Sequence, residues 1–88
     1  MNARERQKAE ERARWGGLVF SEVNALIYIS RYHGAHRTHK TVQKHLQMLL
    51  DGGYIVSDGN EGYVPSEIGR AIVRGIYGDV VNNVNQGG

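Results

Sequence analysis

The chain has 88 residues, no cysteine and a formal net charge of +2. Its length predicts one domain with a modest core, and the absence of cysteine excludes disulfides and cysteine-ligated zinc or iron–sulfur sites. No apolar run approaches the ~20 residues of a membrane helix and the charged N-terminus lacks the apolar core of a signal peptide, so we expect a cytoplasmic protein with no membrane partner.

Residues 1–16 are predicted to form a charged helix or arm that ends at Gly16-Gly17. Its apolar residues are mostly alanine, so it has no wide apolar stripe to bury. Two interpretations remain open: a frayed, solvated helix, or a basic arm that contacts phosphates or a partner subunit. We expect the folded domain to cover residues 17–81 and residues 82–88 to form a disordered tail.

A second helix is predicted from Ser21 to Tyr32. Ser21 is a suitable N-cap, and Val23, Leu26 and Ile29 contribute to an apolar face. Gly34 is a natural stop, and the residues from 33 to 37 are expected to form a short basic connector.

A third helix is predicted from Thr38 to Asp51, and it has two distinct faces. The apolar face has the spacing i, i+4, i+7 and i+8, in Val42, Leu46, Leu49 and Leu50. The opposite face has the spacing i, i+3, i+4 and i+7, in Lys40, Gln43, Lys44 and Gln47. This pattern predicts a helix that packs on one side and presents long polar side chains on the other.

A β-hairpin and a last helix follow. The segments 54–56 and 62–64 are β-branched and aromatic, and Asp58-Gly59 between them is a strong turn signal. Pro65 should close the second strand, and Ser66 should cap a C-terminal helix. The apolar ridge of this helix has a spacing of four, in Ile68, Ile72, Ile76 and Val80.

The stretch 41–73 resembles winged-helix transcription regulators. The resemblance rests on a leucine-rich helix, a step to Gly53-Tyr54-Ile55, an aromatic return strand at Tyr63, and the Ser-Glu-x-Gly-Arg turn of residues 66–70. It implies an α+β, mainly α fold: three helices, a two-stranded β-hairpin wing and a C-terminal helix. It also implies that the third helix reads double-stranded DNA.

The charge distribution is consistent with such a partner. Residues 31–47 carry four basic residues and no acid, within a domain that is otherwise acidic, and this is the electrostatic footprint of a polyanion-binding protein. Glutamine can pair with adenine, lysine with guanine or phosphate, and threonine and helix N-terminal amides with phosphate. The predicted DNA-binding residues are Arg37, Thr38, His39, Lys40, Thr41, Gln43, Lys44, Gln47 and Asn60. An ordinary solvated helix face is the alternative.

We find no sign of an enzyme, a cofactor or a small-molecule ligand, because no phosphate loop or catalytic carboxylate pair is present. The run His33, His36 and His39 could ligate a metal, but it crosses a predicted helix boundary and has no carboxylate beside it, so no metal site is predicted.

Two classes of function therefore remain. The first is a sequence-specific DNA-binding regulator of phage or plasmid type, a repressor or accessory factor, with a replication or partition factor as its variant. The second is a winged-helix module that binds an acidic protein. The C-terminal ridge exceeds what so small a core can cover, which predicts a homodimer through Ile72, Ile76 and Val80.

Overall fold

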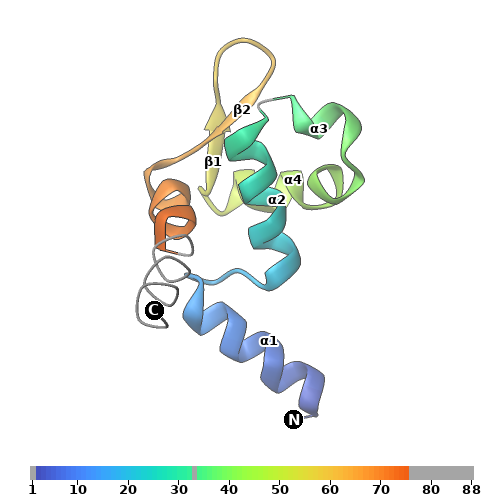
Figure 1. Ribbon diagram of the computed structural model, residues 1–88, viewed down its shortest axis with the longest axis vertical. Coiled ribbons are helices and arrows are strands. Elements are labelled where there is room, and N and C mark those ends of the chain that lie inside the picture. The colour runs from blue at the N-terminus through green and yellow to red at the C-terminus, as the bar shows by residue number, and fades with distance from the viewer. Residues whose placement is uncertain (1, 33, 76–88) are drawn as a thin grey trace, which may run out of the picture.

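The computed structural model describes residues 2–32 and 34–75, and these form an α+β, mainly helical fold (Figure 1). Its elements are α1 (Ala3–Arg14), α2 (Phe20–Arg31), α3 (Ala35–Thr38), α4 (Lys40–Asp51), β1 (Ile55–Ser57) and β2 (Tyr63–Pro65). Residues 67–75 form a last helix, which has no label in the figure. The mainly helical class expected from the sequence is therefore confirmed.

Helix α1 extends away from the rest of the fold (Figure 1). The side chain of Asn2 caps it by accepting a hydrogen bond of 2.8 Å from the backbone N–H of Glu5. None of its residues is buried. The prediction of a charged helix without an apolar face to bury is confirmed.

Helix α2 begins at Phe20, one residue before the predicted cap Ser21, which is exposed inside the helix. The N-cap is Val19, whose backbone N–H donates to Glu22 Oε1 at 2.8 Å. The same carboxylate oxygen lies 3.3 Å from Nη1 of Arg12, which also donates to the carbonyl of Gly17. Buried Glu22 therefore satisfies the backbone N–H of the N-cap residue and ties α1 to α2.

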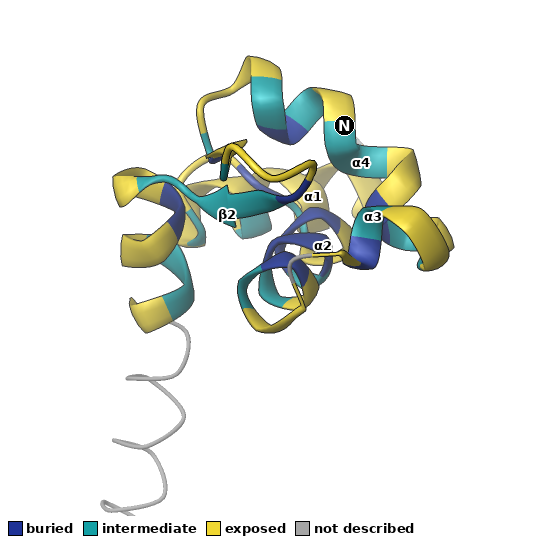
Figure 2. Ribbon diagram, turned by 90° about the horizontal axis from the view of Figure 1, so that it is seen from above, coloured by how far each residue is buried: buried dark blue, intermediate teal, exposed yellow. Residues whose placement is uncertain are grey.

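The core lies mainly between α2, α4 and β1, and Figure 2 shows how much of α2 is buried, in dark blue. Its largest fully buried side chains are Leu18, Leu26, Ile29, Val42, Leu49 and Ile55. On α4 only two of the four predicted core residues, Val42 and Leu49, are fully buried, while Leu46 and Leu50 are half-buried. The reason is that Val42 and Leu49 are two turns apart on the line that faces α2, whereas Leu46 and Leu50 flank that line.

The connector between the second and third predicted helices contains helix α3, so four helices instead of three precede the hairpin. Buried Ala35 anchors this single turn, and its carbonyl accepts from the N–H of His39 at 2.8 Å. His39 is extended, with φ −97° and ψ 115°, and α4 begins only at Lys40. The predicted start of the third helix at Thr38 was wrong because Thr38 ends α3.

The hairpin pairs its strands antiparallel, with Ile55 opposite Pro65 and Ser57 opposite Tyr63. Each strand begins one residue later than predicted, and β2 ends at Pro65, which is its last residue. Tyr54 is outside β1 because its N–H still bonds the carbonyl of Leu49, at the end of α4.

The last helix begins as predicted, with the hydroxyl of Ser66 accepting from the N–H of Gly69 at 3.2 Å. Its backbone passes close to the chain just before β1, since a Cβ at residue 69 would lie 2.1 Å from the carbonyl oxygen of Tyr54. Glycine at position 69 is therefore required by the approach of the two backbones.

Candidate nucleic-acid interface

The outer side of α4 carries a set of exposed polar side chains that we call the polar face: Lys40, Gln43, Lys44 and Gln47. Val42 and Leu49, on the opposite side of the same helix, are completely inaccessible to solvent. The predicted division of α4 into two sides is thus confirmed. Every side chain of the polar face is available to a ligand without disturbing the core.

Both glutamines of the polar face make exposed hydrogen bonds within the chain. Gln43 Nε2 donates to the carbonyl of Arg37 at 3.1 Å, and Gln47 Nε2 donates to Asp51 Oδ1 at 2.8 Å. Because water competes for exposed hydrogen bonds, these contribute little and can be exchanged for contacts with a base. Among the described residues, neither Lys40 nor Lys44 makes an ion pair, so both ammonium groups can be directed at a partner.

The two predicted threonines flank the start of α4. Thr38 is exposed at the end of α3, and Thr41 is half-buried in the first turn of α4. The N-cap His39 gives no side-chain hydrogen bond to that turn. The first amides of α4 therefore have no side-chain cap from their own N-cap residue, and uncapped amides of this kind can donate to an anion.

The imidazole of His39 lies against the ring of Tyr28, with the ring centroids 4.0 Å apart, and it is half-buried. His36, one turn earlier on α3, makes an edge-on contact with Tyr63 of β2 at 4.8 Å. Sequence reasoning missed the packing role of these two rings. Their partners, Tyr28 and Tyr63, lie on α2 and β2, so no local spacing in the sequence signals these contacts.

Arg37 links α3 to the hairpin loop. Its Nη2 lies 3.2 Å from the carbonyl oxygen of Glu61 and 3.4 Å from Glu61 Oε2. The predicted contact residue Asn60 is exposed next to Glu61. Residues 55–65 contain two acids, Asp58 and Glu61, and no lysine or arginine. Glu61 is the neighbour of the interface that sequence reasoning did not identify.

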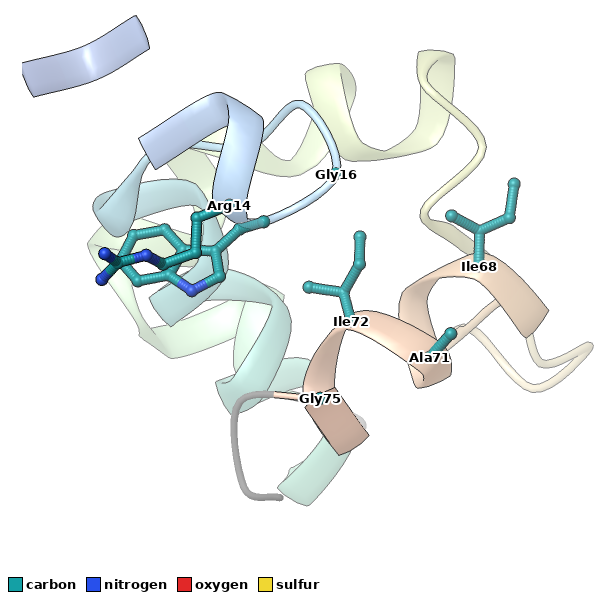
Figure 3. A pocket seen from close by; sticks show the side chains of 7 residues that line it. Arg14, Gly16, Ile68, Ala71, Ile72 and Gly75 are labelled. Atoms are coloured by element: carbon teal, nitrogen blue, oxygen red, sulfur yellow. The ribbon is translucent and has the colours of Figure 1, made fainter. Parts of the chain in front are cut away.

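Of the three predicted dimerisation residues the structure describes only Ile72, which lies on the last helix, away from α4. Ile72 is half-buried, with Cδ1 3.1 Å from where a Cβ on Gly16 would lie, whereas Ile76 and Val80 fall outside the described residues. A groove of about 400 Å³ opens beside Ile72 (Figure 3). Its lining consists of Arg14, Trp15, Gly16, Ile68, Ala71, Ile72 and Gly75.

In the part of the chain that the structure describes, no three His, Asp or Glu side chains are grouped to hold a metal ion. Across residues 2–32 and 34–75, every helix is too short or too polar to cross a membrane. No protein-family model, no curated protein and no solved structure matches the chain. The interface must therefore be interpreted from its own geometry.

Proposed function

We propose that the chain is a sequence-specific double-stranded DNA-binding protein of the winged-helix type, a small dimeric transcription regulator that acts in the cytoplasm. The observation that carries this proposal is the polar face of α4, which has four long, exposed side chains that can donate or accept hydrogen bonds. The opposite side of the same helix is packed into the core. A helix of this kind can enter the major groove as a rigid unit.

The order of the elements supports the winged-helix assignment. Helices α2, α3 and α4 are followed directly by a two-stranded hairpin, as in the family that the sequence resembles. The chain departs from the usual order of helices in this family at α3, which has only 4 residues. In this assignment α4 is the reading helix, while Arg37 and Thr38, just before it, contact the DNA backbone.

A second candidate is a winged-helix module that binds an acidic protein. Asp58 and Glu61 in the hairpin loop bear on this choice, because they would repel phosphates if the hairpin lay along the DNA backbone as a wing does, whereas the acids of a protein partner need not face the hairpin. Such a partner would contact the same basic residues as DNA would: Arg37, Lys40 and Lys44.

Selection from a random duplex library, followed by fluorescence anisotropy with the selected duplex and a scrambled one, separates the two candidates. The proposal requires tighter binding to the selected duplex than to the scrambled one. It also requires an affinity that falls as salt rises, because phosphate contacts release counterions. No duplex selected above background would reject DNA binding and leave the protein partner.

A further inference from the structure

The hairpin loop is held in one shape by Asp58. Asp58 Oδ1 accepts hydrogen bonds from the N–H of Asn60 at 2.6 Å and of Gly62 at 3.0 Å, and the N–H of Asp58 donates to the carbonyl of Gly62. These bonds close the loop over residues 58–62. They also fix the position of Glu61 within the loop.

Glu61 is the only non-glycine residue with positive φ among the described residues, at 64°. A side chain in this left-handed region costs about 1–2 kcal/mol relative to ordinary backbone, and glycine would adopt it freely. The loop thus holds a carboxylate where its backbone favours glycine. A strained residue that the surrounding structure keeps in place is a reason to look for a function.

In this conformation two oxygens of Glu61, the backbone carbonyl and Oε2, both approach Arg37. The guanidinium Nη2 is 3.2 Å from the carbonyl oxygen and 3.4 Å from Oε2. The ion pair is largely in solvent, since the two side chains are 56% and 90% exposed. An ion pair this exposed contributes little to folding, so stability does not explain it.

Arg37 lies just before the reading helix, where the proposed function places the DNA backbone. We infer that the Glu61 carboxylate is an internal competitor for Arg37, taking the position of a DNA phosphate and lowering affinity for any duplex irrespective of sequence. This inference rests on the proposed DNA-binding function. Because phosphate contacts give affinity without sequence information, such a competitor limits non-specific binding and leaves base reading to α4.

The test uses Glu61→Gln in the full chain, with a selected duplex and a scrambled one, by anisotropy between 50 and 200 mM salt. Removing the competitor should tighten binding to both duplexes by about two- to fivefold. One more phosphate contact should steepen the dependence of log K on log salt by about 0.9. The ratio between the two duplexes should not change.

Two controls separate this mechanism from a general change of charge. Glu67→Gln removes the same charge from the exposed first turn of the last helix, and should tighten binding less than Glu61→Gln. In an Arg37→Ala background, the gain from Glu61→Gln should shrink to that of Glu67→Gln, because the group for which Glu61 competes is missing. If the Arg37–Glu61 ion pair served only to hold the hairpin in place, Glu61→Gln would instead lower both the melting temperature and the affinity for DNA.

The inference is overturned if Glu61→Gln leaves affinity unchanged or weakens it, or if its gain persists undiminished without Arg37. In those cases the wild-type chain still binds DNA and the proposed function stands. If neither the wild-type chain nor any variant binds either duplex, the proposed function fails and the inference fails with it.

Discussion

The arrangement of the core makes a sharp prediction about two leucines of α4. Leu49 is completely buried against α2, whereas Leu46, almost one turn earlier, is half-buried. Leu49→Ala should lower the free energy of unfolding by about 2–5 kcal/mol, the range for buried leucines that leave a cavity. Leu46→Ala should cost about 1–2 kcal/mol, because a half-buried side chain loses roughly half of the transfer free energy and leaves no closed cavity.

These losses are large for a chain of 88 residues, whose expected stability is about 4–13 kcal/mol. Urea unfolding followed by circular dichroism at 222 nm measures the loss of unfolding free energy in each variant. The comparison requires that the free energy of unfolding depend on urea concentration with the same slope in both variants. The reasoning is refuted if the two variants lose equal stability, or if Leu46→Ala loses more. Either result would mean that α4 is rotated about its axis relative to α2.

Two further predictions concern the last helix. Gly69→Ala should destabilise the fold by about 1–3 kcal/mol, because its Cβ would meet the carbonyl of Tyr54. Gly75→Ala should be neutral or stabilising, because a Cβ there would have nothing within 4 Å. Equal melting temperatures for the two variants would contradict this prediction. The homodimer predicted from the apolar ridge should appear in sedimentation equilibrium, and Ile76→Asp should convert it to a monomer with weaker DNA binding. A monomeric wild-type chain at high micromolar concentration would end that prediction.

Much of α4 could be predicted from the sequence because a helix of 12 residues repeats its apolar positions several times. Helix α3 could not, since one turn of 4 residues has no periodicity to detect. The cap of α2 was misplaced because sequence rules look for a serine, whereas here the carboxylate of Glu22 reaches back to Val19.

The neighbours of the candidate interface depend on contacts between distant parts of the chain. Arg37 and Glu61 are separated by 24 residues, and their approach follows from how α3 and the hairpin pack together. No local pattern encodes such a pair. The polar face of α4 was predicted in full because its four members lie on one helix and share its period.

The central claim is that the polar face of α4 reads DNA, and Lys44→Ala and Gln43→Ala test it most directly. Both residues are exposed, so circular dichroism should stay that of the wild-type chain. Arg70→Ala, which removes one exposed positive charge from the last helix, is the control for charge alone. Each of the two α4 variants should lose about 1–3 kcal/mol of binding to the selected duplex, and Arg70→Ala should lose less. Unchanged affinity in both α4 variants, with the fold intact, would contradict the claim.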